Sequence, residues 1–142
     1  MNTATVMTRD VVVVSPTVSI GSAARMMEVK RIRHLPVVEA GRLVGIVSDR
    51  DLVKRSPNAS CAEVMTAAPV TCLPNASVSH VARLMIEHKI DSIPIVNYSG
   101  TLAGLVTSTD LLSLLVDENR AGALPFEFRM QRATSDGDPL FD

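Results

Sequence analysis

The apolar positions of the chain follow the same helical spacing in two separate places. After each of two serines, Ser19 and Ser77, apolar residues recur at steps of 0, +3, +4 and +7. The two series are Ile20, Ala23, Ala24 and Met27, and Val78, Val81, Ala82 and Met85. Residues at these steps share one face of an α-helix, and serine is a favoured N-cap residue. We therefore expect an amphipathic helix to begin directly after each serine.

Short apolar runs surround each predicted helix and indicate β-strands. The runs are residues 11–14, 35–38 and 43–47 in the first half, and residues 70–73, 93–96 and 102–106 in the second. The first run of each half ends near a proline, which fixes φ and removes a backbone donor. A last helix is expected to begin at Ser48 in the first half and at Thr107 in the second. Each half therefore has the predicted order β-α-β-β-α.

The two halves are copies of one sequence pattern. Val-Met-Thr at residues 6–8 recurs at residues 64–66, which is 58 positions later, and one inserted residue then moves the offset to 59. The matching pairs are Pro16 and Pro74, Ser19 and Ser77, Ala24 and Ala82, Met27 and Met85, Pro36 and Pro94, Gly45 and Gly104, Val47 and Val106, Asp51 and Asp110, and Leu52 and Leu111. So many ordered matches indicate an internal repeat. We assign the copies to residues 2–55 and 60–116.

Neither copy is large enough to bury a stable core by itself. We therefore expect an α/β (α+β) fold in which two β-α-β-β-α repeats pack through their sheets, with the helices outside. Such a pair has pseudo-twofold symmetry and leaves two related clefts between the copies. Residues 117–142 lie outside the repeat and contain Phe126, Phe128 and Phe141. This C-terminal extension is either a frayed tail or a strand that docks on a partner or subunit.

Composition removes several classes of function. Lys and Arg number 14 against 15 Asp and Glu, and aromatic residues make up 3% of the chain. Nucleic-acid binders usually carry a basic surplus or stacking aromatics, so we expect no nucleic-acid partner. No apolar run approaches the ~18–20 residues of a membrane span, and residues 1–10 lack a signal-peptide pattern. Cys61 and Cys72 are isolated thiols. We expect a cytoplasmic protein with no membrane partner.

A strand that ends in Ser or Thr and is followed three residues later by Asp is the strongest chemical signal. The pattern occurs at Ser48 and Asp51 and again at Thr107 and Asp110. One interpretation is a capping box at a helix start. The other is a nucleotide site, in which the helix N-terminus and hydroxyl meet an anion while the carboxylate accepts hydrogen bonds from ribose hydroxyls. The residues alone leave both interpretations open.

Evidence for catalysis or metal binding is lacking in the sequence. His80 and His88 are eight residues apart on a predicted helix, and no third ligand lies nearby. None of the GxxxxGK, GxGxxG, GxSxG or HExxH motifs occurs. We therefore predict that the protein is not an enzyme and holds no metal.

The doubled pattern resembles a tandem pair of cystathionine β-synthase (CBS) domains, also called a Bateman module. The resemblance rests on Val-Met-Thr, a helix, Leu/Ile-Pro-Val/Ile-Val and then Gly-x-Val-Ser/Thr-x-x-Asp, and it covers residues 2–116. It implies a regulatory module that binds AMP, ADP, ATP or S-adenosylmethionine between the repeats. It also implies a homodimer and a target protein that responds to ligand occupancy.

The resemblance further implies which residues share a cleft. The first cleft would contain Thr8, Val11, Ile32, Arg33, His34, Thr107 and Asp110. The second cleft would contain Ser48, Arg50, Asp51, Thr66, Ile90, Asp91 and Ser92. In each set the aspartate after the Ser or Thr would hold ribose, and the hydroxyl would face phosphate.

The charges predict that the two clefts differ. Arg33 and His34 supply cations to the first cleft, whereas the equivalent Asp91 and Ser92 place a carboxylate in the second. We therefore expect the first cleft to bind AMP, ADP or ATP, and the second to bind more weakly or to prefer a less anionic adenosyl ligand. An alternative is that residues 30–34 form only a solvated basic turn. The alternative for the whole protein is a structural dimerisation module with empty clefts.

Overall fold

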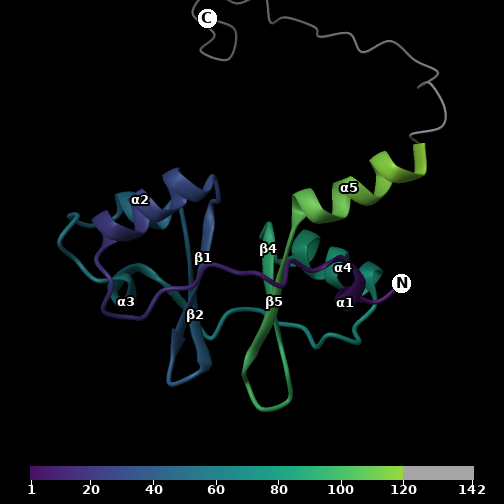
Figure 1. The fold of residues 1–142 in the computed structure, drawn as a ribbon, viewed down its shortest axis with the longest axis horizontal. Coiled ribbons are helices and arrows are strands. Elements are labelled where there is room, and N and C mark those ends of the chain that lie inside the picture. The colour runs from purple at the N-terminus through teal and green to yellow at the C-terminus, as the bar shows by residue number, and fades with distance from the viewer. Residues whose placement is uncertain (120–142) are drawn as a thin grey trace, which may run out of the picture.

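The computed structural model describes residues 1–119 and shows two halves side by side, each with a hairpin and covering helices (Figure 1). The elements are α1 (Thr3–Val6), α2 (Ile20–Lys30), β1 (His34–Glu39), β2 (Arg42–Ser48), the 3₁₀-helix η1 (Asp51–Val53), α3 (Cys61–Val64), β3 (Thr66–Ala67), α4 (Val78–His88), β4 (Ser92–Val96), β5 (Leu102–Thr107) and α5 (Ser108–Asn119). The predicted extension beyond residue 119 lies outside the described residues.

The two capped helices are confirmed. The Ser19 hydroxyl accepts a hydrogen bond from the Ser22 N–H at 3.1 Å, and the Ser77 hydroxyl accepts one from the His80 N–H at 3.1 Å. The buried positions of α2 and α4 are Ile20, Ala23 and Met27, and Val81 and Met85. Ala24 is exposed although we expected it on the apolar face. The stripe of α2 that packs inward is therefore narrower than the spacing predicted.

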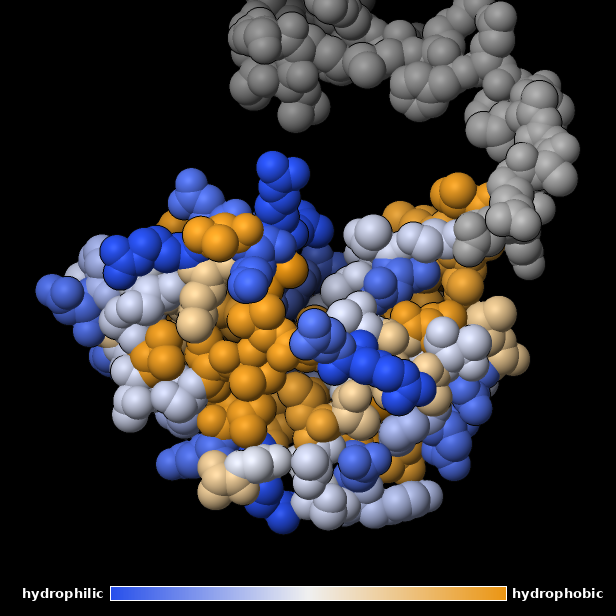
Figure 2. Space-filling model, in the orientation of Figure 1, coloured by the Kyte–Doolittle hydropathy of each residue, from blue (hydrophilic) through white to orange (hydrophobic). Residues whose placement is uncertain are grey.

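Two antiparallel hairpins form the sheets. β1 pairs with β2 so that Leu35 lies opposite Val47, and β4 pairs with β5 so that Ile93 lies opposite Val106. All four of these side chains are fully buried. They belong to two separate core clusters, one in each half. Figure 2 shows that hydrophobic side chains also reach the surface along α5.

The predicted strands at residues 11–14 and 70–73 are wrong. Only Val14 and Cys72 form bridges in these runs, to Val37 and Ile95 in parallel orientation. For a parallel ladder to continue, the residue two positions after Val14 or Cys72 must donate its N–H to the neighbouring strand. Those positions are Pro16 and Pro74, which have no N–H, so each ladder stops after one bridge.

The last helix differs between the repeats. α5 begins at Ser108, one residue after the predicted start at Thr107, and runs to Asn119, but the helix expected from Ser48 is only the 3₁₀ turn η1. Pro57 follows η1 closely, and the residue before a proline is disfavoured in the α conformation. The sequence from 108 to 116 has no proline and is rich in leucine. The first repeat therefore lacks room for a full helix.

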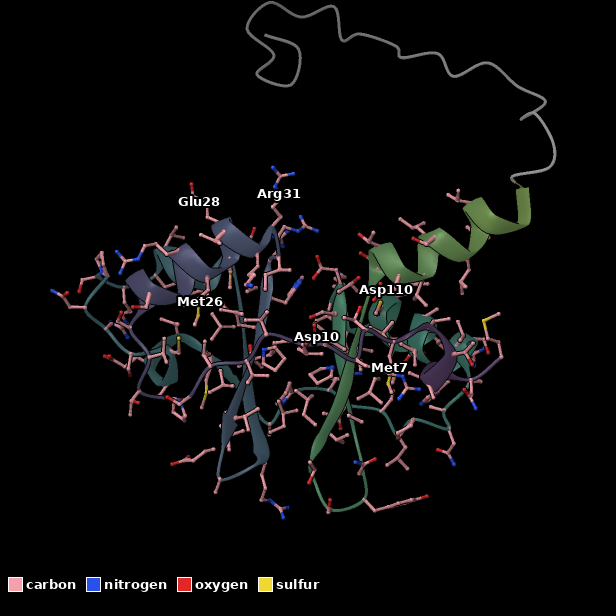
Figure 3. All side chains as sticks on the ribbon, viewed as in Figure 1. Met7, Asp10, Met26, Glu28, Arg31 and Asp110 are labelled. Atoms are coloured by element: carbon pink, nitrogen blue, oxygen red, sulfur yellow. The ribbon has the colours of Figure 1, made fainter. Side chains whose placement is uncertain are left out.

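The start of each repeat packs on the other half. Met7 (Figure 3) belongs to the second core, whereas Cys61 and Val64 belong to the first. Thr8 and Leu105 exchange backbone hydrogen bonds of 2.8 and 3.0 Å, and β3 pairs with β2. The sequence copies at residues 2–55 and 60–116 are therefore interleaved in space. Each half of the structure needs a segment from the other copy.

Candidate functional site

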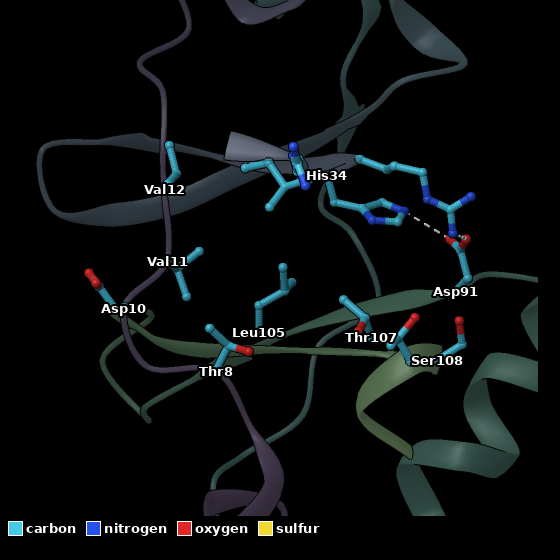
Figure 4. Close-up of a pocket in the computed structure, with 13 residues that line it drawn as sticks. Thr8, Asp10, Val11, Val12, His34, Asp91, Leu105, Thr107 and Ser108 are labelled. Carbon is cyan, nitrogen blue, oxygen red and sulfur yellow. Dashed lines mark hydrogen bonds and ion pairs between the residues drawn. The ribbon is translucent and has the colours of Figure 1, made fainter. Parts of the chain in front are cut away.

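Two open clefts lie between the halves. The first has a volume of about 300 Å³ and is lined by Thr8, Asp10, Val11, Val12, Arg31, Ile32, Arg33, His34, Asp91, Leu105, Thr107, Ser108 and Thr109 (Figure 4). The second, of about 230 Å³, is lined by Arg33, His34, Ile46, Ser48, Asp49, Arg50, Asp51, Thr66, Pro69, Val70, Lys89, Ile90, Asp91 and Ser92. Each cleft draws residues from both repeats.

The structure brings together nearly all of the residues predicted for the two clefts. In the second cleft, all seven predicted residues line the walls. In the first cleft, six of the seven do, but Asp110 does not. The three residues that directly precede Asp110 line this cleft instead, at the junction of β5 and α5.

Several lining residues were missed by sequence reasoning. They are Asp10, Val12, Arg31, Leu105, Ser108 and Thr109 in the first cleft, and Ile46, Asp49, Pro69, Val70 and Lys89 in the second. Apart from Asp10, each of them occupies a position whose repeat equivalent lines the other cleft. Mapping the residues of one cleft through the repeat offset would have found most of them.

Both aspartates of the Ser/Thr-x-x-Asp pattern bond to the main chain that precedes them. Asp51 Oδ2 accepts from the Ser48 N–H at 2.8 Å and from the Ser48 hydroxyl at 3.1 Å. Asp110 Oδ2 accepts from the Thr107 N–H at 2.8 Å, and Thr107 Oγ1 accepts from the Asp110 N–H at 3.3 Å. Thr107 and Asp110 therefore form a capping box at the start of α5, whereas the Ser48 hydroxyl donates to Asp51 and no side chain caps η1. A role in holding ribose stays a prediction and would use the other carboxylate oxygen.

Asp51 is the more constrained carboxylate. Its Oδ1 lies 2.8 Å from Lys54 Nζ, and its side chain is 12% exposed. Burial by itself would raise the pKa of Asp51, but the hydrogen bonds from Lys54 and Ser48 outweigh burial and lower its pKa. The folded protein therefore holds this carboxylate ionised more firmly than the unfolded chain does.

Asp51→Asn should destabilise the protein most above pH 4. A lowered folded-state pKa stabilises the protein at pH values above the ordinary pKa of 3.8, and this stabilisation is lost as the pH falls through the folded value. We expect Asp51→Asn to lower the free energy of unfolding by about 1–2 kcal/mol at pH 6. Urea unfolding from pH 3 to pH 7 should show this difference shrinking in acid. Asp49→Asn, at an exposed position two residues away, is the control. A difference in unfolding free energy between Asp51→Asn and the wild type that does not change with pH would contradict the prediction.

A charge cluster lies where the two clefts meet. His34 Nε2 lies 2.8 Å from Asp91 Oδ1, and Arg33 Nη2 lies 3.6 Å from Asp91 Oδ2. All three residues line both clefts. The side chain of Arg33 is 62% exposed, whereas that of His34 is only 10% exposed. The solvated-turn interpretation therefore describes Arg33 but not His34.

This cluster corrects the predicted separation of charge. We expected Arg33 and His34 to serve the first cleft and Asp91 the second. The structure places cations and carboxylate at both, because Arg33 and Asp91 occupy equivalent positions and meet across the boundary between the halves. A bare carboxylate therefore does not face the second cleft.

Among residues 1–119, no group of three His, Cys, Asp or Glu side chains is arranged to hold a metal ion. In the same residues, no helix is both long and apolar enough to cross a membrane.

Cys61 and Cys72 are buried in different cores, and burial raises the pKa of both thiols.

The family model of the CBS domain matches the chain twice, over residues 4–58 and 61–117. The chain belongs to the CBS-domain family. Its mixed fold of helices and small antiparallel sheets matches solved CBS pairs. The CBS pair of protein MJ0100, solved with 5′-methylthioadenosine and S-adenosyl-L-methionine, has a TM-score of 0.78 at 28% identity and covers 83% of this chain and 98% of its own. CBSX2, solved with AMP, has a TM-score of 0.76 at 26% identity, with 84% and 98% coverage.

Curated relatives include both small and large CBS proteins. The CBS domain-containing protein YhcV of Bacillus subtilis is 34% identical over 123 residues, which cover 82% of this chain and 87% of YhcV. Inosine-5′-monophosphate dehydrogenase of Thermoplasma acidophilum is 34% identical over 109 residues. The match covers 77% of this chain but only 22% of the dehydrogenase. Similarity to that enzyme is therefore confined to a CBS pair.

Proposed function

We propose that this CBS pair binds adenosine derivatives in its two clefts and passes their occupancy to a partner protein through a conformational change. The observation that carries the proposal is the pair of open, repeat-related clefts, each with a Ser or Thr at a strand end, apolar walls and cations. The ligands in the solved neighbours MJ0100 and CBSX2 all contain adenosine and support this ligand class. AMP, ADP, ATP and S-adenosylmethionine are the candidates.

Each part of an adenosine nucleotide finds a suitable surface in the first cleft. Val11, Ile32 and Leu105 offer apolar contact for a flat purine. Thr107 lies at the start of α5, where its hydroxyl and the positive end of the helix dipole favour phosphate oxygens. Arg33 adds a permanent positive charge.

The first cleft is better suited to phosphate than the second. α5 has 12 residues, so its aligned peptide dipoles favour an anion at its N-terminus. The corresponding element at the second cleft, η1, has only 3 residues and offers no comparable dipole. We therefore still expect the first cleft to prefer AMP, ADP or ATP. The reason is now the dipole of α5 and no longer a separation of cations and carboxylate between the clefts.

Ligand-dependent stability tests the proposal. Urea unfolding with AMP, ATP or S-adenosylmethionine at about 100 times the dissociation constant should raise the free energy of unfolding by about 2.7 kcal/mol. Ribose 5-phosphate, which lacks the base, should have little effect. No stabilisation by any adenosine derivative would favour a structural module with empty clefts. ATP should be recovered intact, since we propose a regulatory rather than a catalytic role.

An exposed apolar face supports self-association. The side chains of Ile86, Leu112, Leu115 and Val116 are 55–77% exposed on α4 and α5. Patches of this kind commonly mark contact surfaces between proteins. Together with the homodimer implied by the resemblance, this face leads us to propose that two copies associate through α4 and α5.

Leu112→Glu should convert such a dimer into monomers. A carboxylate at this position would be desolvated in the interface, which costs several kcal/mol per dimer. Sedimentation velocity at micromolar concentration should show the mass halved. The control is Val53→Glu on η1, where the side chain is 85% exposed and outside this face. Equal masses for the wild-type protein and both variants would contradict association through this face.

A further inference from the structure

The two clefts share one carboxylate. Asp91 lines both of them, and it contacts His34 (Figure 4) and Arg33, which also line both. The other acidic residues along the clefts, within residues 1–119, each line a single cleft. Asp10 lines the first, whereas Asp49 and Asp51 line the second. Asp91 is therefore placed to affect ligand binding on both sides.

The shared cluster arises from opposite charges at equivalent repeat positions. Arg33 precedes β1 and Asp91 precedes β4, so the packing of the halves brings them to the same boundary. Had both positions been cations, two positive charges would face the clefts unopposed. Here one carboxylate already contacts both the Arg33 guanidinium and the His34 ring. Whether Arg33 or His34 can contact a ligand depends on whether that side chain is bound to Asp91.

The ion pair between Arg33 and Asp91 can open without leaving either charge buried and unsolvated. The side chains of Arg33 and Asp91 are 62% and 45% exposed, so water can solvate either group after separation. An exposed ion pair contributes little net stability. A phosphate group in a cleft can therefore compete with Asp91 for the Arg33 guanidinium.

We propose, on the basis of the adenosine-binding function above, that Asp91 sets the charge specificity of both clefts and couples them. In each cleft Asp91 opposes ligand phosphate by repulsion and by occupying Arg33 and His34. When an anionic ligand in one cleft draws Arg33 toward itself, Asp91 is less neutralised and disfavours an anion in the other cleft. By thermodynamic linkage the effect is reciprocal. Uncharged adenosine ligands should fill the two clefts independently.

Isoleucine methyl NMR can report each cleft separately. Ile32 lines the first cleft, whereas Ile46 and Ile90 line the second. The full chain, labelled at isoleucine δ1 methyls, would be titrated with AMP as wild type and as Asp91→Asn. We expect Asp91→Asn to lower the AMP concentration at half-saturation about fivefold at Ile32 and at Ile90, the effect of one unit charge at close range. The difference between the AMP midpoints at Ile32 and Ile90 should also be smaller in Asp91→Asn than in the wild type.

Two matched substitutions separate a shared carboxylate from a general change in surface charge. Asp10→Asn removes one negative charge from the first cleft alone and should shift only the Ile32 midpoint. Asp49→Asn removes one from the second cleft alone and should shift only Ile46 and Ile90. With the uncharged probe 5′-methylthioadenosine, all variants should have wild-type midpoints.

The outcomes distinguish this inference from the proposed function. If AMP binds but Asp91→Asn moves the midpoint of one cleft only, or of neither, Asp91 is not shared and the inference is overturned. An equal effect of Asp91→Asn on 5′-methylthioadenosine would also overturn it, since charge would not be the cause. If neither AMP nor 5′-methylthioadenosine shifts any isoleucine methyl of the wild-type protein, the adenosine-binding function fails and the inference fails with it.

Discussion

Gly104→Ala should destabilise the folded protein by about 1–3 kcal/mol and disturb the first cleft. A Cβ at residue 104 would lie 2.8 Å from the backbone oxygen of Thr8 and 2.7 Å from Met7 Sδ. The methionine can rotate away, but the Thr8 oxygen is held by its hydrogen bond from the Leu105 N–H at 3.0 Å. The crossing segment must therefore move away from β5. Urea unfolding would measure the loss of stability.

Gly21→Ala is the matched control for this substitution. Gly21 lies in α2, and a Cβ there would meet Pro57 at an ordinary 3.4 Å. Alanine is favoured over glycine in a helix, so this variant should be as stable as the wild type or up to about 1 kcal/mol more stable. Gly45→Ala should resemble Gly104→Ala, because its Cβ would lie 3.0 Å from the Thr66 oxygen. If Gly104→Ala has the same unfolding midpoint as the wild type, the fold does not require the backbone of Thr8 to lie this close to β5.

The pattern of apolar residues did not predict the interleaving of the repeats. Hydrophobic spacing shows which face of a segment is apolar, but not which copy of the repeat that face packs against. Met7 and Met65 occupy equivalent positions, so either could have packed in its own half. The glycine in each Gly-x-Val motif was a usable signal, since glycine within a strand often marks the close approach of another backbone.

Local patterns were sufficient for the elements that depend on local physics. Ser19 and Ser77 cap their helices because capping involves only the next three residues. The short η1 was missed because the interruption by Pro57 lies beyond the pattern that predicted a helix. The pairing of Arg33 with Asp91 was missed for a different reason. Opposite charges at equivalent positions are visible in the sequence, but their distance depends on how the halves pack.

Asp110→Ala should separate the capping role of this carboxylate from a role in ligand binding. Loss of the bond between Asp110 Oδ2 and the Thr107 N–H should reduce the free energy of unfolding by about 1 kcal/mol without ligand. If Asp110 also accepts hydrogen bonds from ribose, AMP affinity of the first cleft should fall at least about tenfold. The Ile32 methyl would report this loss, since Ile32 lines the first cleft.

Glu63→Ala provides the comparison that makes this result interpretable. Glu63 Oε2 accepts from the Ser60 N–H at 2.8 Å, which is the same backbone cap geometry, but Glu63 is exposed at α3 and lines neither cleft. Both variants should lose comparable stability, and only Asp110→Ala should lose AMP affinity. Equal AMP affinity in the two variants would show that Asp110 acts as a helix cap alone. Asp51→Ala would make the same test of ribose binding in the second cleft. There Lys54 Nζ already donates a hydrogen bond to Asp51 Oδ1, the oxygen that ribose would need.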